Sequence, residues 1–404
     1  MIEVKASLIG RNVYVAGEQL HCIITLTNVA QSDNVKSTIN LFNNDNKDDT
    51  GVERLAWSTA QIHCQCVVNE SRINVPQEYK NTQRNSDQAV DIGTYFAPNR
   101  GDAGHSAYLS KPQVLCCDLI LGPGVSKTFH YVETLPYNCP PSYRGNNVKY
   151  AYKLSIGFQK LHSSMKLLRI PMRVININGV DDMQQYMETE PTEIPTNPFL
   201  SHLKKESSFL DNALEVLSIQ ASRRNLGCYS ITSKSGLVGK FILYKVAYRL
   251  GEDIVGYFDF AEAQVSCLQY TVVLQSLEEV RKECLKHSSQ SRSVNASYSR
   301  FSEACISTVN THFILPVPLT VTPGFDSSLV TLRWRLRFEF IISVHDLANS
   351  EYNGRKHLPD EAWQGPSEVE TESLIWDLPI EVLATNPVQA FPTVPARLTA
   401  NLLL

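Results

Sequence analysis

The sequence has 404 residues, enough for two or three domains of ordinary size, and hydrophobic residues make up 43% of it. Charged residues contribute 19% and the formal net charge is −4, which favours neither a nucleic-acid-binding protein nor a disordered acidic chain. No signal peptide and no apolar run of transmembrane length is visible, so we expect a protein of the reducing cytosol whose ten cysteines are free thiols.

Short segments of strand length, rich in β-branched and aromatic residues, dominate the chain. The clearest of them lie at residues 21–27, 61–68, 114–121 and 148–158. Polar stretches with little apolar surface, which we expect to be loops, lie at residues 30–50, 69–112, 285–302 and 346–371. Strands separated by turn signals are typical of a β-sandwich or β-barrel.

One amphipathic helix is predicted after an acidic linker interrupted by prolines. Residues 207–222 place Leu210, Leu214 and Leu217 on one face, because these leucines follow each other at helical spacing. This apolar stripe either packs on one of the sandwiches or docks a partner protein. The pattern leaves both interpretations open.

The second half of the chain repeats the first half. The motif Tyr14-x-x-Gly17-Glu18 recurs as Tyr248-x-x-Gly251-Glu252, and each copy precedes a strand. Two further matches keep the same order, and they join residues 148–156 to 330–338 and residues 170–175 to 378–383. An ordered set of matches indicates duplicated domains. The glycine of each motif is expected to form a tight structural turn, because such a turn needs a residue without Cβ.

These observations predict an all-β protein with two tandem β-sandwich domains and one linker helix. The predicted units are an N-terminal sandwich at 1–177, a linker with the amphipathic helix at 178–225, a C-terminal sandwich at 226–385, and a flexible tail at 386–404.

No catalytic centre for covalent chemistry is visible. The sequence has no glycine-rich phosphate loop, no GxSxG motif and no HExxH motif. The nearest approach to a metal site is His63-Cys64-x-Cys66, but on a strand His63 points away from both cysteines. We therefore expect no catalytic, cofactor-binding or metal-binding residues.

Two motifs suit binding. Arg333, Arg335 and Arg337 alternate with apolar residues, so they line the outer face of a strand as either a solvated face or a patch for acidic lipid headgroups or an acidic partner. The segment 140–143 reads Pro-Pro-Ser-Tyr and matches PPxY, the ligand of WW domains. The alternative for this segment is a structural turn ahead of the strand at 148–158.

The tandem sandwiches, each opening with Tyr-x-x-Gly-Glu, resemble the arrestin fold. Over residues 1–175 and 205–385 the chain is similar to the Rgp family. The resemblance is carried by the segments 148–154 (VKYAYKL), 239–256 (GKFILYKVAYRLGEDIVG) and 376–380 (WDLPI).

Members of the Rgp family are arrestin-like partner subunits of an exchange factor for the Rab-six class of GTPases. The resemblance implies that this protein pairs with Ric, a large WD-repeat subunit, and promotes GDP release only in that complex. It implies a protein of the cytosol and, peripherally, of the Golgi membrane, acting in retrograde vesicle trafficking from endosomes, with no cofactor and no nucleic acid. The alternative is an α-arrestin-type adaptor that carries a ubiquitin ligase to membrane cargo and uses PPxY motifs.

Overall fold

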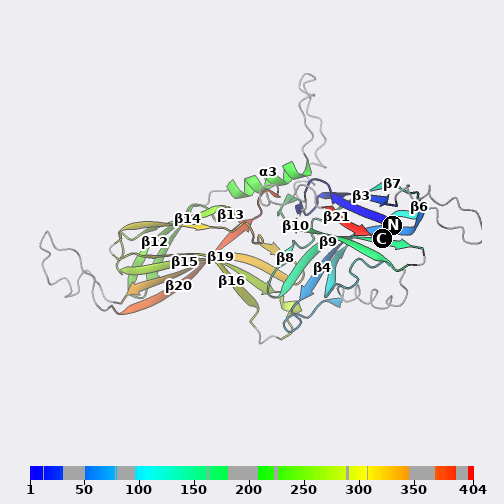
Figure 1. Ribbon diagram of the computed structural model, residues 1–404. Coiled ribbons are helices and arrows are strands. Elements are labelled where there is room, and N and C mark those ends of the chain that lie inside the picture. The colour runs from blue at the N-terminus through cyan, green and yellow to red at the C-terminus, as the bar shows by residue number, and fades with distance from the viewer. Residues whose placement is uncertain are drawn as a thin grey trace, which may run out of the picture.

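The computed structural model describes residues 1–11, 13–30, 51–77, 79, 96–161, 163–180, 208–222, 226–287, 291–306, 308–344, 369–387 and 399–404. It consists of two β-sandwiches arranged end to end, with one helix lying over their junction (Figure 1). In the described part of the chain, no helix is long and apolar enough to cross a membrane. The two sandwiches confirm the predicted all-β fold.

The N-terminal sandwich packs a four-stranded sheet, in the order β21-β1-β3-β7, against a larger sheet in the order β2-β10-β9-β4-β5. In the larger sheet, β6 also pairs with β4 and β8 with β9. The strands are β1 (Ile2–Leu8), β2 (Val13–Val15), β3 (Gln19–Asn28), β4 (Glu53–Val68), β5 (His105–Leu109), β6 (Gln113–Leu121), β7 (Ser126–Thr134), β8 (Tyr143–Arg144), β9 (Val148–Lys160), β10 (Lys166–Ile175) and β21 (Thr399–Leu403). Alternate residues of β3 and β9, such as Ile24 and Ile156, are fully buried in the core between the sheets.

The C-terminal sandwich has the same strand order. One sheet runs β11-β12-β14-β17, and the other runs β13-β20-β19-β15-β16 with β18 paired to β19. The elements are α3 (Phe209–Ser222), β11 (Gly227–Ser233), β12 (Gly236–Leu243), β13 (Ala247–Arg249), β14 (Asp253–Asp259), β15 (Cys267–Val280), the 3₁₀ turn η3 (Lys282–Cys284), β16 (Ser293–Ala304), β17 (Asn310–Pro316), β18 (Phe325–Asp326), β19 (Val330–Ser343) and β20 (Thr371–Leu383). Its core is aromatic, and the Phe241 ring lies 4.9 Å from both Phe258 and Phe338.

The sequence repeat is a structural repeat. Strand β2 pairs in parallel with β10, with Tyr14 opposite Val174, and β13 pairs in parallel with β20, with Tyr248 opposite Val382. The glycine of each motif has a positive φ, 92° at Gly17 and 85° at Gly251. Such values favour glycine because a Cβ is strained there. The matched segments thus occupy equivalent places in two sandwiches of equal topology.

The glutamate of each repeated motif fixes its turn. The Val15 N–H donates to Glu18 Oε2, and the Arg249 N–H donates to Glu252 Oε2, at 2.9 Å in both cases. A basic side chain reaches each carboxylate as well, Arg11 in the first domain and Lys245 in the second. The same backbone-to-carboxylate bond therefore closes both turns.

Two segments differ from the loops expected in the sequence. Residues 293–304 form β16, which pairs with β15 along most of its length, and residues 105–109 form β5. Strand β16 is an edge strand whose side chains are partly or fully exposed, so its polar sequence lacks the apolar alternation that predicts strands. The loop prediction is therefore wrong for these residues.

The end of the chain also differs from the expected flexible tail. Thr399–Leu403 form β21, which pairs antiparallel with β1 in the N-terminal sandwich. Ala400 and Leu402 pack against the N-terminal core. The expectation is thus wrong for these last residues, because they gain both ladder hydrogen bonds and apolar burial, while residues 388–398 lie outside the described residues.

Candidate functional site at the domain junction

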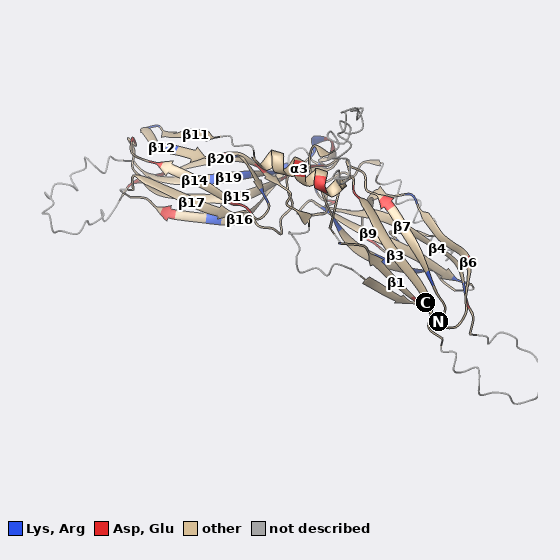
Figure 2. Cartoon of the chain, turned by 90° about the horizontal axis from the view of Figure 1, so that it is seen from above, with Lys and Arg blue, Asp and Glu red and all other residues tan. Residues whose placement is uncertain are grey.

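Helix α3 lies across the boundary between the two sandwiches, as the view from above shows (Figure 2). Its first turn is capped reciprocally, because the Asp211 N–H donates to Ser208 Oγ at 3.2 Å and the Ser208 hydroxyl donates to Asp211 Oδ2 at 2.8 Å. Beneath it, residues of both domains form a small third core. The core residues are Val13, Val15, Ile175, Ile177, Val180, Ala213, Val216, Leu217, Ala221, Ala247, Leu383 and Ala384.

The predicted apolar stripe of the helix faces this junction core. Leu217 is 2% exposed, and Leu210 and Leu214 are half-buried against the same cluster. The stripe therefore covers the junction within the chain itself, while Ile219 on the outer side is 51% exposed. Docking of a partner by this helix stays a prediction.

A buried carboxylate joins the two sandwiches. Glu278 of β15 is 3% exposed and accepts hydrogen bonds from the backbone N–H groups of Asn146, Asn147 and Val148 at 2.8 to 3.1 Å. These N–H groups belong to the first residue of β9 and the two residues before it, in the other domain. Hydrogen bonds to a charged acceptor are stronger than neutral ones, so this contact fixes one domain against the other. We call it the Glu278 clamp.

Side chains around the clamp extend the contact. The Tyr143 and Phe325 rings meet edge to face with centroids 5.0 Å apart, and the Tyr150 hydroxyl donates to Ser327 Oγ at 3.1 Å. The N-terminal core also includes residues of the C-terminal domain. These are Val280, Cys284, Phe325, Leu329, Val330 and Leu332. The two sandwiches therefore share a continuous apolar interface.

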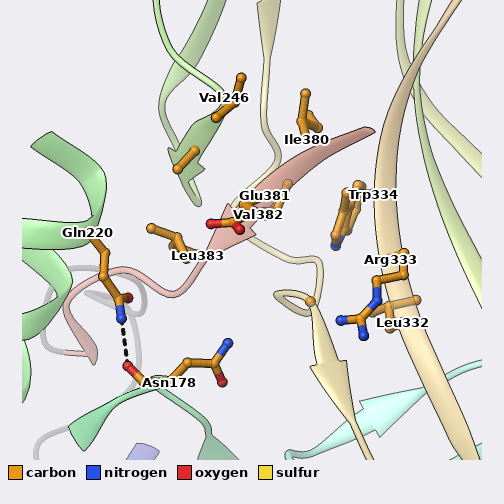
Figure 3. Close-up of a pocket in the computed structure, with 12 residues that line it drawn as sticks. Asn178, Gln220, Val246, Leu332, Arg333, Trp334, Ile380, Glu381, Val382 and Leu383 are labelled. Atoms are coloured by element: carbon orange, nitrogen blue, oxygen red, sulfur yellow. Dashed lines mark hydrogen bonds between the residues drawn. The ribbon is translucent and has the colours of Figure 1, made fainter. Parts of the chain in front are cut away.

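A cleft of about 410 Å³ opens at this junction beneath the helix. Figure 3 shows Gln220 donating to the carbonyl oxygen of Asn178, with Trp334 and the apolar wall of β20 opposite. Arg333 and Glu381 are the charged residues of its lining. Most of the lining is apolar, with a few polar groups, a composition that suits the binding of another molecule.

The arginine stripe lies where the sequence places it, on the outer face of β19. Each guanidinium has an acidic partner, however. Arg333 Nη2 is 2.9 Å from Asp326 Oδ2, and Asp377 Oδ2 lies 2.7 Å from Arg335 Nη1 and 3.5 Å from Arg337 Nη1. Three arginines therefore share two aspartates, so the net positive charge of the patch is smaller than the sequence of β19 alone indicates.

The segment matching PPxY is built into the N-terminal domain. The Ser142 N–H donates to the carbonyl oxygen of Val174 at 2.7 Å, and the Tyr152 hydroxyl donates to the carbonyl oxygen of Pro140 at 2.5 Å. Tyr143 packs on Phe325, as described above. A WW domain needs an accessible polyproline II segment, so this anchoring favours the structural-turn interpretation.

A buried polar group in the N-terminal domain has the composition of a catalytic triad. His63 Nδ1 lies 3.4 Å from Ser155 Oγ, and His63 Nε2 lies 3.2 Å from Asp102 Oδ2. Burial lowers the pKa of His63 to about 4, so the imidazole is neutral at pH 7. Ser155 is fully buried and donates to the carbonyl oxygen of Pro98, so the group is a structural network closed to substrates.

No cluster of three or more His, Cys, Asp or Glu side chains suited to a metal ion occurs among the described residues. Sequence reasoning missed Glu278 and the aspartates that pair with the stripe. The only signal for Glu278 is an acidic residue at an inward position of a strand, between the buried Ser276 and Val280. Burying a carboxylate costs free energy unless it accepts hydrogen bonds, so an acidic residue at an inward position indicates a buried polar contact.

The comparisons with known proteins agree on one family. The Rgp1 family model matches residues 103–187 and 179–343. The RAB6A-GEF complex partner protein 2 of Homo sapiens is 38% identical over 414 residues, covering 100% of both chains. The protein of the same name from Bos taurus is 37% identical over 398 residues, covering 96% of this chain and 95% of the relative. The chain therefore belongs to the Rgp1 family.

Proposed function

We propose that this protein is a subunit of a guanine nucleotide exchange factor for a Rab-six-class GTPase. The observation that carries the proposal is the 38% identity to the human RAB6A-GEF complex partner protein 2, which covers the full length of both chains. Because the match is full-length, it includes both sandwiches, the junction helix and the last strand.

Nucleotide exchange needs binding surfaces rather than a bond-making residue. A factor that binds the nucleotide-free GTPase tightly lowers the affinity of the GTPase for GDP, because the coupling of two ligands is reciprocal. A two-domain subunit serves this purpose best when its surfaces keep a fixed geometry. The Glu278 clamp and the core beneath α3 supply that rigidity.

The proposal extends to the partner and the place of action. The chain acts with a large WD-repeat protein of the Ric type, and the pair works at the cytosolic side of Golgi membranes in retrograde transport from endosomes. Family resemblance supports both statements. The relatives' name, which describes a partner protein of a complex, agrees with a chain that acts in an assembly.

The test is release of a fluorescent GDP analogue from the Rab-six GTPase. We expect little or no release with this chain alone, and full release when the large partner is added at equal concentration. Full activity of this chain by itself would refute a partner-dependent role. An absence of activity from the assembled pair would refute the exchange function itself.

A further inference from the structure

The cleft at the domain junction contains polar groups that the protein leaves without partners. The indole Nε1–H of Trp334 and the side-chain Oε1 of Gln220 are buried, and neither has a hydrogen-bond partner among the described residues. Trp334 is 2% exposed, and both residues line the cleft. A buried donor or acceptor without a partner costs free energy, so such groups are rare in folded proteins. Two of them in one cleft indicate a site that a ligand completes.

The duplicated domain shows how the same position is satisfied within the chain. In the strand pairs that the repeat matches, Tyr152 of β9 lies opposite Met172 of β10. Trp334 of β19 lies opposite Ile380 of β20, so Trp334 is the equivalent of Tyr152. The Tyr152 hydroxyl donates to the carbonyl oxygen of Pro140 at 2.5 Å. The architecture therefore allows this polar group to be satisfied internally, and in the described part of the C-terminal domain it is not.

Gly324 keeps the cleft open. Its N–H donates to the carbonyl oxygen of Val382 at 3.0 Å. In the N-terminal domain the Ser142 N–H makes the same bond to Val174 at 2.7 Å, and the Ser142 hydroxyl accepts from the Val174 N–H at 2.9 Å. Gly324 has no side chain to take that place, although its φ is not positive and an added Cβ would lie no closer than 3.4 Å to a neighbouring atom. The glycine therefore leaves room in the cleft without meeting a steric demand of the backbone.

The two unpartnered groups define the kind of ligand. Figure 3 shows Gln220 on α3 and Trp334 on β19 at opposite sides of the cleft, with β20 between them. The ligand must offer an acceptor to Trp334 and a donor to Gln220. The carbonyl and N–H groups of an extended peptide point to opposite sides of its chain, so one segment lying between the two walls supplies both. Both groups are covered before binding, so we expect small side-chain rotations when the segment enters.

The rest of the lining adds an apolar and a charged preference. Leu332 and Ile380 present aliphatic side chains, and the volume of about 410 Å³ lies in the range of about 300–1,000 Å³ that is usual for ligand sites. Arg333 is paired with Asp326, whereas the exposed Glu381 has no ion pair with any residue that the structure describes. A lysine or arginine next to an aliphatic residue of the peptide complements this arrangement.

We infer that the junction cleft binds an extended peptide segment of another protein, in which an aliphatic residue is adjacent to a lysine or arginine. A main-chain carbonyl of that segment accepts from the Trp334 indole, a main-chain N–H donates to Gln220, and the basic residue pairs with Glu381. This inference goes beyond the proposed exchange function and does not depend on it.

The test uses a displayed library of random peptides as the probe. The library is first depleted on Gly324→Leu, in which a leucine side chain fills the cleft without removing any of its polar groups. Peptides that then bind the full-length wild-type protein are selected and sequenced. We expect them to share an aliphatic residue next to a lysine or arginine. A selection that returns no peptide above background, or peptides without this pattern, would overturn the inference.

Dissociation constants of a selected peptide, measured by fluorescence polarisation, test the individual contacts. Trp334→Phe removes the indole N–H and should weaken binding roughly fivefold, the contribution of one hydrogen bond. Glu381→Gln should weaken binding roughly threefold at low salt and less at high salt. The matched controls are Trp376→Phe and Glu372→Gln on β20, which are not part of the cleft lining and should leave the affinity unchanged. Equal effects of each variant and its control would contradict the inference.

A milder change guards against misfolding. Gly324→Ser places in the cleft the side chain that Ser142 contributes in the N-terminal domain, and we expect an unaltered melting curve with severalfold weaker peptide binding. It replaces Gly324→Leu in the depletion step if the leucine variant melts differently from the wild type. If Gly324→Ser and Trp334→Phe both keep wild-type affinity, the peptide lies elsewhere and the inference is wrong. GDP release is measured separately, so a failure of the exchange function would leave this result unaffected.

Discussion

Replacing Glu278 by Gln should loosen the contact between the two domains without altering the shape of the side chain. The carboxylate accepts from three backbone N–H groups, and both of its oxygens are used. In the amide one oxygen becomes an NH₂ donor, so either Asn146 or Val148 loses its acceptor.

The free energy lost by this substitution can be summed from these hydrogen bonds. A buried N–H without an acceptor costs about 1–3 kcal/mol, and each remaining bond loses about 1 kcal/mol when its acceptor becomes neutral. The total is about 3–5 kcal/mol, which corresponds to an opening equilibrium at least roughly 100-fold more favourable.

Hydrogen exchange of the amides of residues 146–148 measures this opening directly, because these N–H groups are the ones that Glu278 binds. We expect their exchange to be at least roughly 100-fold faster in Glu278→Gln. The control is Glu279→Gln, since Glu279 is next on β15 and faces the other side of the sheet. Unchanged protection of residues 146–148 in Glu278→Gln would refute the clamp.

The remaining predictions concern the repeated turns and the arginine stripe. Gly251→Val should lower the free energy of unfolding by about 1–3 kcal/mol, because φ is 85° and an added Cβ would lie 2.8 Å from Leu319 Cδ2. Gly17→Val should lower the free energy of unfolding further, because its Cβ would overlap the Tyr137 ring. Unaltered thermal melting of both variants would contradict this. Changing Arg333, Arg335 and Arg337 together to Ser should cost only about 1–2 kcal/mol, since surface ion pairs contribute little. The same variant should weaken binding to the large partner or to anionic liposomes at low salt if the stripe docks either one, and unchanged binding to both would exclude that role.

Alternation and repetition predicted most of the fold. Strand β9 was visible because Val148, Tyr150 and Tyr152 alternate cleanly with exposed residues, and its partner in the repeat, β19, alternates in the same way. The turn motifs were visible because a positive φ restricts the choice of residue at Gly17 and Gly251. These features depend on local backbone geometry, which restricts the residue types at nearby positions of the sequence.

Features of the site that depend on pairing across the fold were not visible. The sequence places Arg335 on an outer face, but only the register of β19 with β20 brings Asp377 beside it. Likewise Glu278 looks like one more strand glutamate until the start of β9 is packed against it. Local patterns constrain which way a side chain points, while its charge balance depends on partners that are distant in sequence.

The last strand shows why domain boundaries could not be taken from the repeat alone. In the C-terminal sandwich the edge beside β12 is covered by β11, which immediately precedes it in the chain. In the N-terminal sandwich the equivalent edge, beside β1, is covered by β21 from a distant part of the chain. An uncovered edge would leave a row of N–H and C=O groups open to pairing with other chains. The N-terminal domain is therefore assembled from two distant parts of the sequence, and Thr399–Leu403 belong to it structurally even though the C-terminal domain lies between them.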